Sequence, residues 1–552
     1  MIYIRDVKLK INHSDNAIKI KASEILKLDS IFKNGRIPDF NIEIIRQSID
    51  ARKKPDIFYI YSIAVDLGVN ENKVKNFLTK KKINNIDFND PVKYSIPFTG
   101  DESLKKPPVI IGAGPCGLFA AYLLASRGFK PIVIERGEAV EERSFTVEHF
   151  FKTGDLDPES NVQFGEGGAG TFSDGKLNTM TKDTNGRNSF VLKTFYECGA
   201  DKKITYVAKP HIGTDVLKSV VVNLRKKIIE LGGQFFFDTK MTNFAKKDNK
   251  VTRVDLLHNK TGFEFYIETD LLLLCIGHSA RDTFEMLYQK GLKLEQKNFA
   301  VGFRVSHPQR LVDRWQLGVN DAKELSLEAS DYKVTNEASN GRRVYSFCMC
   351  PGGYVVNASS EDNRLAVNGM SENKRDSGYA NSAIICSITP DDFVQDIVAS
   401  DHPLSGMYYQ RNIEEKAFLL ANGKIPIQYF EDFENDKSSE NVNEKDYCTK
   451  GKCQSSNLRN IYSEDIDTAI IESIHKFGYT RKGFDGDKCV MLGVETRTSS
   501  PIRITRDEFL VSSIQGLYPC GEGAGFAGGI TSAAADGIRV AEAIIKKYYP
   551  DY

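Results

Sequence analysis

One segment, Pro107–Gly137, constrains the fold of this chain more than any other; it reads PPVIIGAGPCGLFAAYLLASRGFKPIVIERG. Its apolar residues Val109–Ile111 predict a short strand that runs into a glycine-rich turn, Gly112–Gly117. The residues after the turn repeat apolar side chains at helical spacing, which predicts a helix. Pro131–Ile134 then predicts a second strand, with Glu135 at its end. This order of strand, turn, helix and strand is typical of a parallel sheet.

Each part of this unit has a physical role in binding a dinucleotide. Gly112 permits the tight turn, Gly114 lets the backbone approach a pyrophosphate, and Gly117 lets the helix pack closely on the strand. The free amides and positive dipole end of the helix attract phosphates. Glu135 follows Gly112 by 23 positions, where an acid accepts hydrogen bonds from an adenosine ribose. The segment therefore predicts a dinucleotide site.

The far end of the chain indicates which dinucleotide is bound. Gly516–Ile545 predicts a strand, Leu517–Cys520, that ends in a glycine cluster and leads into a helix beginning near Gly529. In FAD proteins of this kind an acid after the last strand binds the ribityl chain, and the helix N-terminus faces the flavin. Here that acid is Glu522, where Asp is usual. The arrangement favours FAD over NAD as the resident cofactor.

Two segments between these ends fit the same interpretation. Thr214–Leu231 predicts an amphipathic helix, and the strand after it, Gln234–Phe237, leads to Met241, which we expect beside the adenine. Leu271–Gly277 predicts a buried strand whose end touches the diphosphate region. His278, next to it, is either a structural histidine or a catalyst.

Composition excludes several classes of protein. The 552 residues are 41% hydrophobic and carry 74 Lys and Arg against 74 Asp and Glu, so the chain has no global attraction to nucleic acid or to anionic membranes. No run is apolar enough for a signal peptide or a membrane span. The ten cysteines are scattered, as in a reducing cytoplasm. We expect a cytoplasmic protein without a membrane partner.

The first hundred residues predict a separate small α/β unit. Strands are expected at Ile2–Ile4, Val7–Ile11 and Ile57–Val65, and helices at Ala22–Phe32 and Asn41–Ala51. Five lysines on or after a later helix form either a solvated face or a patch for RNA or an acidic partner: Lys73, Lys75, Lys80, Lys81 and Lys82. Pro97–Pro108 predicts a linker, and the polar stretch Glu434–Asn460 predicts an exposed insertion or loop.

The predicted fold is α/β: a Rossmann-like three-layer FAD/NAD(P)-binding domain with an inserted mixed α+β substrate domain and a small N-terminal α/β domain. The expected ranges are 1–100 for the N-terminal domain, 101–285 and 485–552 for the two parts of the FAD-binding domain, and 286–484 for the substrate domain.

Several longer phrases carry a family resemblance: GEGGAGTFSDGKLNT (Gly165–Thr179), YSFCMCPGG (Tyr345–Gly353), NGMS (Asn368–Ser371) and GVETRTSSPIRI (Gly493–Ile504), with RQSIDARKK (Arg46–Lys54) near the start. With them the chain resembles the FAD-dependent dehydrogenases once called NAD(FAD)-utilising dehydrogenases over essentially its full length. It is more distantly similar to geranylgeranyl reductases and aromatic hydroxylases, glutathione-reductase-type flavoproteins with a single Rossmann domain. The resemblance implies a bound FAD and supplies no substrate.

By analogy with flavoproteins, Gly168, Ala169, Gly170 and Thr171 are expected near the flavin or pyrophosphate, with Ser173, Asp174 and Lys176 on the substrate side. Lys176 or Arg497 either stabilises reduced flavin or forms an ordinary ion pair. The full set of residues expected to contact FAD is Gly112, Gly114, Pro115, Cys116, Gly117, Glu135, Arg136, Arg143, Gly168, Ala169, Gly170, Thr171, Met241, Gly277, Gly521, Glu522, Gly528, Gly529 and Ile530.

Cys348 and Cys350 stand two positions apart in a predicted strand. There, i and i+2 share a face with Cα atoms ~6.6 Å apart, at the edge of disulfide reach. They are either a redox-active pair or small cysteines lining the flavin pocket. Cys448 and Cys453 lie in the polar stretch without a histidine to complete a zinc set, so no metal site is predicted.

Three functions remain open from the sequence. The first is a FAD-dependent oxidoreductase that moves hydride or electrons to or from a small molecule or an electron carrier. Because the chain has no second strand–GxGxxG–helix unit, NADH or NADPH would bind only transiently. The second is a flavin-binding interaction protein without turnover, and the third is a flavin-dependent RNA-modifying enzyme, supported by the basic N-terminal segment alone. The sequence predicts neither the catalytic side chains nor the oligomeric state.

Overall fold

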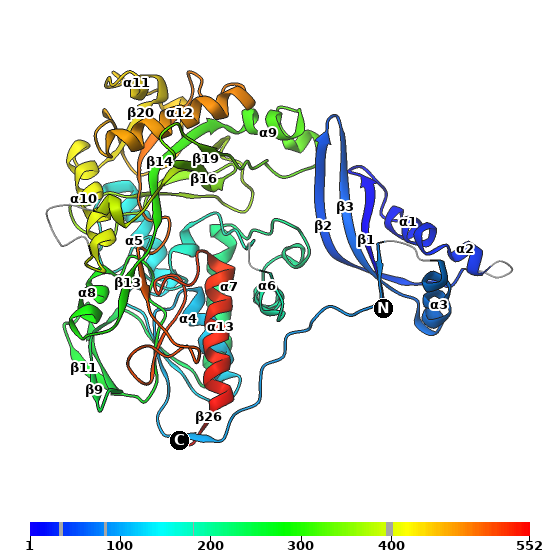
Figure 1. The fold of residues 1–552 in the computed structure, drawn as a ribbon, viewed down its shortest axis with the longest axis horizontal. Helices are drawn as coiled ribbons and strands as arrows, with labels where there is room; N and C mark the ends of the chain where they lie inside the picture. Colours follow the sequence, from blue (N-terminus) through cyan, green and yellow to red (C-terminus); the bar gives the residue numbers. More distant parts are fainter. Residues whose placement is uncertain (33–36, 82–84, 180–181, 394–400) are drawn as a thin grey trace.

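The computed structural model describes residues 1–32, 37–81, 85–179, 182–393 and 401–552. An N-terminal unit stands to one side of a larger body, and an extended segment connects the two (Figure 1). The N-terminal sheet is antiparallel in the order β2-β3-β1-β4. Its elements are β1 (Ile2–Lys10), α1 (Ala17–Leu26), α2 (Leu28–Ile31), β2 (Asn41–Lys53), β3 (Asp56–Asp66), α3 (Glu71–Lys81) and β4 (Ile86–Asp87).

The helix predicted at Asn41–Ala51 is wrong, because this segment is strand β2. Ile42 and Ile44 alternate along one face, pair with Val65 and Ile63 of β3, and pack on the apolar core of the N-terminal sheet. Branched Cβ atoms favour such a pleated surface. The strands expected around Ile2–Ile11 and Ile57–Val65 are confirmed as β1 and β3.

The predicted lysine-bearing helix is α3, and Lys82 lies outside the described residues. Lys75 of α3 pairs with Glu71 at 2.8 Å, one turn earlier on the same helix.

Strand β2 contacts the larger body through its backbone. The N–H of Gln47 donates to the carbonyl oxygen of Tyr206, and the carbonyl oxygen of Gln47 accepts from the N–H of Ala208, both at 2.8 Å.

The centre of the larger body is a parallel five-stranded sheet in the order β25-β12-β6-β7-β8. Its strands are β6 (Val109–Ile111), β7 (Ile132–Ile134), β8 (Gln234–Phe236), β12 (Leu272–Leu274) and β25 (Leu517–Pro519). All five coincide with strands that the sequence predicts, within one to three residues at their ends. The predicted Rossmann-like α/β layer is therefore confirmed.

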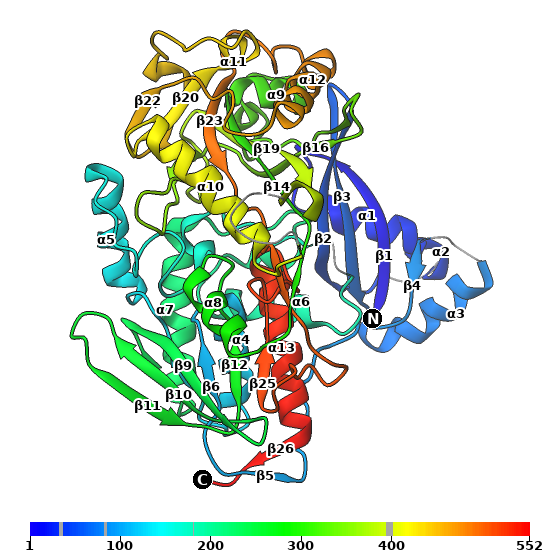
Figure 2. The ribbon, with the colours of Figure 1, turned by 60° about the vertical axis from the view of Figure 1, so that its left-hand side comes forward.

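Alternate residues of these strands serve two apolar cores. Ile110, Val133 and Leu273 pack with helices on one face, and Ile111, Leu274 and their neighbours pack on the other. The helices are α4 (Pro115–Ala125), α6 (Arg187–Glu197), α7 (Thr214–Glu230) and α13 (Ile530–Lys547). The opposite face is covered by the antiparallel strands β9 (Thr239–Lys247), β10 (Lys250–His258) and β11 (Glu264–Glu268), visible in Figure 2. This completes three layers.

A second, seven-stranded sheet lies above the first in Figure 1, in the order β15-β16-β19-β14-β23-β20-β22. Its strands are β14 (Phe299–Pro308), β15 (Thr335–Glu337), β16 (Arg343–Cys350), β19 (Tyr379–Ile388), β20 (Ile425–Tyr429), β22 (Cys453–Ser455) and β23 (Val490–Glu495). The helices α9 (Gln309–Leu317), α10 (Ser405–Leu420) and α12 (Glu464–Thr480) accompany it. With β23 the sheet continues past residue 484 of the predicted substrate domain.

The predicted exposed loop Glu434–Asn460 is wrong in part. It supplies β22 to the seven-stranded sheet and β21 (Thr449–Lys450) to a small sheet with β17 (Tyr354–Asn357) and β18 (Val367–Met370). Val442 and Leu458 anchor the stretch because both are buried in the apolar core of the seven-stranded sheet. Its polar composition concealed these two contacts.

The predicted linker Pro97–Pro108 also contains structure, because β5 (Glu102–Leu104) pairs with the C-terminal strand β26 (Tyr548–Pro550). The remaining elements are α5 (Val140–Thr153), α8 (Arg281–Gln289), β13 (Leu294–Gln296), α11 (Phe430–Glu434), β24 (Ile502–Ile504) and short 3-10 turns. No helix in the described ranges has the length and apolar character needed to cross a bilayer.

Candidate functional site

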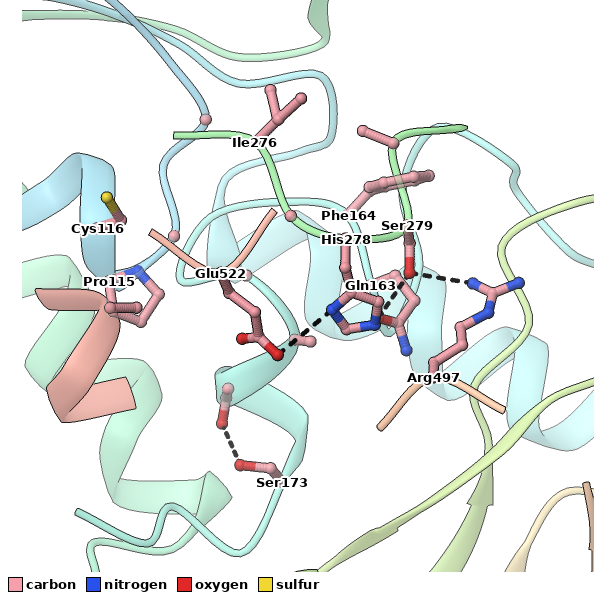
Figure 3. A pocket seen from close by; sticks show the side chains of 18 of the residues that line it. Pro115, Cys116, Gln163, Phe164, Ser173, Ile276, His278, Ser279, Arg497 and Glu522 are labelled. Carbon is pink, nitrogen blue, oxygen red and sulfur yellow. Dashed lines mark hydrogen bonds and ion pairs between the residues drawn. The ribbon is translucent and has the colours of Figure 1, made fainter. Parts of the chain in front are cut away.

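A cavity runs between the parallel sheet and the seven-stranded sheet. One end is lined by the glycine turn with Glu135 and Met241, and the other by Phe347, Cys348 and Glu495. Figure 3 shows the middle of the cavity, where Pro115 and Cys116 lie across from Ser279 and Arg497. Residues that the sequence predicts as cofactor contacts and that line the cavity are Gly112, Gly114, Pro115, Cys116, Glu135, Arg136, Gly168, Ala169, Gly170, Met241, Gly277, Glu522, Gly528, Gly529 and Ile530.

The glycine turn has the close contacts that the sequence predicts. Gly112 has φ +104, and a Cβ there would lie 2.5 Å from the carbonyl oxygen of Cys275. At Gly117 a Cβ would lie 1.9 Å from the carbonyl oxygen of Gly112, so the helix could not approach the turn. Gly117 does not itself line the cavity; it permits the packing that forms it.

Other glycines leave the space that a dinucleotide needs. A Cβ on Gly277 or Gly528 would have no atom within 4 Å, and on Gly114 the nearest atom would be 3.9 Å away. The helices α4 and α13 begin at this space with Gly114 and Gly529 as N-caps, and neither cap supplies a side-chain acceptor. Free amides and two positive dipole ends therefore face the cavity, which fits a pyrophosphate and an electron-rich ring.

Glu135 does more in this structure than the sequence predicts. Its Oε2 accepts from Ala113 N at 2.7 Å, and its Oε1 accepts from Gly137 N at 3.0 Å and Gly165 N at 2.9 Å. The residue is 5% exposed. It therefore ties the glycine turn to the loop that carries Gly165–Gly170, beside the position expected for the ribose.

Arg143 and Thr171 belong to the support of the site and do not line the cavity. Arg143 is fully buried and donates to five backbone carbonyls, those of Asn161, Val162, Gly165, Glu166 and Gly168. Thr171 is also buried, and its hydroxyl donates to Glu166 O. Gly521 likewise stays behind the lining, where its N–H donates to Asp536. Arg143 thus holds the loop that forms one wall.

Arg136 lines the cavity, and two carboxylates neutralise the charge of its guanidinium. It donates to Glu159 at 2.7 Å and to Asp282 at 2.9 Å, and its guanidinium stacks over the Phe164 ring with 4.1 Å to the centroid. Its pKa is raised by these two carboxylates, although burial acts in the opposite direction. Arg136 therefore offers a flat, charge-paired surface near Glu135.

His278 and Glu522 face each other in the middle of the cavity (Figure 3). Nδ1 of His278 is 3.4 Å from Oε1 of Glu522, and Nε2 of His278 is buried with no hydrogen-bond partner in the described part of the chain. Most buried polar nitrogens have a hydrogen-bond partner, and in a cavity that partner can be a ligand. The orphaned Nε2 therefore favours a ligand or a proton-transfer role for His278.

The two cations singled out from the sequence differ in their surroundings. Arg497 pairs with the fully buried Glu414 at 2.8 Å and donates to Ser279 at 3.2 Å, so its charge is compensated. Lys176 donates to the carbonyl oxygen of Met349 and is 3.8 Å from Asp174, which itself pairs with Arg375. The charge of Lys176 is therefore less fully compensated by carboxylates than the charge of Arg497.

Glu495 is a lining residue that the sequence does not single out. It is 3% exposed and pairs with the fully buried Arg304 at 2.9 Å, and burial raises its pKa. Gln163, Phe164 and Ser279 were also missed. Glu495 falls within the phrase GVETRTSSPIRI. The motif therefore indicates that this segment belongs to the family, but it does not indicate that Glu495 lines the cavity.

Three thiols converge behind the glycine turn. Cys116 Sγ is 3.1 Å from Cys520 Sγ and 3.5 Å from Cys275 Sγ, and all three side chains are buried. Burial raises the pKa of Cys116 and of Cys520 well above the usual range. Protonated thiols at these distances pack against one another as small polarisable groups. The sequence assigned only Cys116 to this region's binding surface.

Comparisons with family models match three parts of the chain. Residues 298–498 match a FAD-dependent protein, C-terminal domain-like; residues 110–161 match an NAD(P)-binding Rossmann-like domain; and residues 1–66 match a domain of unknown function. The first two matches contribute the two walls of the cavity, and together with the geometry above they make FAD the cofactor of this fold.

Solved structures with weaker likeness include flavoproteins. A glycerol-3-phosphate dehydrogenase from Bacillus halodurans complexed with FAD is 11% identical with a TM-score of 0.36; the match covers 80% of this chain and 64% of that one, less than two thirds of its length. The E. coli quinol fumarate reductase subunit FrdA is 11% identical with a TM-score of 0.36, covering 81% and 70%. A geranylgeranyl bacteriochlorophyll reductase-like protein from Thermoplasma acidophilum is 12% identical with a TM-score of 0.34, covering 80% and 78%.

A relative matches from end to end. An uncharacterized protein of Clostridium beijerinckii is 42% identical over 551 residues, which cover 99% of each chain. Combined with the domain matches, this identity shows that the chain belongs to a family of FAD-dependent, oxidoreductase-like proteins that includes the Clostridium beijerinckii protein.

Proposed function

We propose that this chain is a FAD-dependent oxidoreductase that transfers hydride or electrons between FAD and a small molecule bound at the Cys348 end of the cavity. The observation that carries the proposal is the continuity of this cavity, which runs from the glycine turn and Glu135 to Phe347, Cys348 and Glu495 on the second sheet. A site for the cofactor alone would not need the second wall. The family phrases also support a place among the NAD(FAD)-utilising dehydrogenases of glutathione-reductase type.

Bound FAD supplies two-electron chemistry, and the residues of this chain bind, orient and exchange protons. The N-termini of α4 and α13 stabilise negative charge on the pyrophosphate side and on the ring side. Nε2 of His278 holds or accepts the proton that accompanies hydride transfer, and Glu522, 3.4 Å from the opposite nitrogen, orients the ring. Lys176 supplies positive charge in the lining of the cavity.

An anaerobic titration of the FAD-loaded protein with NADH, and separately with NADPH, tests this function. We expect at least one of them to bleach the visible flavin band, with transient binding of the nicotinamide. If dithionite bleaches the flavin and both nicotinamides leave it oxidised, electrons must enter from a substrate or a carrier protein. If substrates and carriers also leave the flavin unchanged, the chain is a flavin-binding interaction protein and the proposal fails.

A further inference from the structure

The wall of the cavity that belongs to the seven-stranded sheet presents two cysteines at the end of β16. Cys348 and Cys350 both line the cavity, and Cys348 is exposed there, whereas Cys350 is 1% exposed. Cys448 and Cys453, the other pair close in sequence, lie outside the lining. The two cavity thiols have no role in the function proposed above.

The backbone of β16 is irregular at this point. Phe347 pairs with Ala383 and Cys350 with Asn381, so the bulged strand β16 carries one extra residue between the two pairs. Within this bulge Cys348 has φ +40, a left-handed conformation that side chains with a Cβ rarely adopt. Bulges and such backbone conformations occur beside active sites, where they redirect a side chain. Here the redirected residue carries the exposed thiol.

The second thiol is packed against the residue that carries the first. Sγ of Cys350 is 3.2 Å from the carbonyl oxygen of Cys348, and the guanidinium of Arg304 is 3.7 Å from the same sulfur. Arg304 also donates to the Cys348 carbonyl at 2.6 Å. One fully buried arginine therefore fixes both cysteine residues, and its own position is fixed by Glu495.

Two cations lie close to the cysteine pair, and their charges favour the thiolate forms. Arg304 donates to the carbonyl oxygen of Cys348, and Lys176 donates to that of Met349, the residue between the two cysteines. Cys350 is buried, and this burial raises the pKa of its thiol to about 11. At neutral pH Cys350 therefore holds its proton.

We propose that Cys348 and Cys350 are a redox-active dithiol that exchanges two electrons with bound FAD, and that thiol or disulfide compounds are the class of electron partner this end of the cavity takes. The inference rests on the proposed function, since it needs the flavin in this cavity. In the step, two S–H bonds break and one S–S bond forms between Cys348 and Cys350. The two electrons and two protons pass to the oxidised flavin, and the reverse reaction regenerates the dithiol.

Counting electrons in an anaerobic dithionite titration of the full-length FAD-loaded protein tests the proposal. The oxidised protein should take up four electrons per FAD, two for the flavin and two for the disulfide. Cys348→Ser and Cys350→Ala should each take up two. The matched control is the double variant Cys448→Ser, Cys453→Ser. It removes two cysteines that are close to each other in sequence but lie outside the cavity, and it should still take up four electrons per FAD.

Alkylation followed by mass spectrometry gives a readout that needs no variant. In the oxidised protein the peptide containing both cysteines should resist alkylation, and after reduction it should carry two alkyl groups. An uptake of two electrons by the unaltered protein, with both cysteines alkylated in the oxidised state, would overturn the dithiol while leaving the proposed oxidoreductase intact. A flavin that no biological donor reduces would instead remove the proposed function, whatever the alkylation result.

Discussion

Nδ1 of His278 lies 3.4 Å from Oε1 of Glu522, in a pair that joins the end of β12 to the turn after β25. Since Nε2 of the same ring is buried without a partner in the described ranges, one nitrogen is held and the other is free to exchange a proton. The two residues follow β12 and β25, which are neighbours in the parallel sheet, and ligands bind at the carboxyl ends of such strands.

Replacing His278 by Gln should lower the rate of substrate-linked flavin turnover by about 100-fold or more, because a positioned proton donor contributes that much. FAD content should change little. Stopped-flow measurement of flavin reduction gives the rate. His475→Gln is the control, since His475 pairs with Glu434 and Asp485 away from the cavity. Equal rates in the two variants would exclude the proton-transfer role.

Gly277→Ala should weaken FAD binding without weakening the fold. A Cβ at Gly277 meets no protein atom within 4 Å, so it would occupy the space reserved for the cofactor. We expect roughly tenfold weaker binding, about 1.4 kcal/mol, and an unchanged Tm of the cofactor-free protein. Gly117→Ala provides the contrast, because its Cβ would lie 1.9 Å from the Gly112 carbonyl and should lower the Tm as well. An unchanged FAD affinity of Gly277→Ala would place the cofactor elsewhere.

Glu135→Ala should destabilise the protein even without cofactor. The substitution leaves three backbone N–H groups without an acceptor, those of Ala113, Gly137 and Gly165. Each unsatisfied buried donor costs about 1–3 kcal/mol, so we expect a loss of several kcal/mol in urea unfolding. Glu142→Ala, at an exposed position of α5, is the control. A loss confined to FAD affinity would show that Glu135 acts on the ribose alone.

Glu166 makes stability depend on pH. Burial raises its pKa to about 7 from 4.5, and its Oε1 has no hydrogen-bond partner in the described part of the chain. The folded protein therefore keeps this proton at a pH where the unfolded chain has lost it. The resulting stabilisation is complete below pH 4.5 and is lost as the pH rises through about 7.

Glu166→Gln removes this titration, so its unfolding free energy relative to the unaltered protein should rise between pH 4.5 and about 7. The increase should reach up to about 3 kcal/mol. Urea unfolding at a series of pH values measures the difference between the two proteins. A difference that stays constant across that range would mean that Glu166 is already ionised in the folded state.

The parallel sheet could be predicted because its information is local. The turn, the helix and the strands around Val109–Ile134 follow from glycine positions and apolar spacing within a short segment. Segment Asn41–Ala51 is predicted as a helix because its charged residues interrupt the alternation of apolar and polar side chains that is typical of a strand. Only the pairing of β2 with β3 explains its strand conformation.

The walls of the cavity were predictable only in part. Gly112, Gly114 and Glu135 belong to one short motif, but His278, Glu495 and Cys348 come from three distant strand ends. Arg143 illustrates the limit: its sequence position suggested a cofactor contact, and five backbone carbonyls from a single loop make it a support instead. Such contacts depend on the folded path of a loop that carries no periodic pattern.

The absorption spectrum of the purified full-length protein, with the released cofactor identified by chromatography and quantified per chain, tests the central claim most directly. The account predicts a flavin spectrum and about one FAD per chain in the unaltered protein, with a reduced content in Gly277→Ala. A colourless protein that takes up no FAD on reconstitution would contradict it. The glycine-lined cavity would then need another ligand.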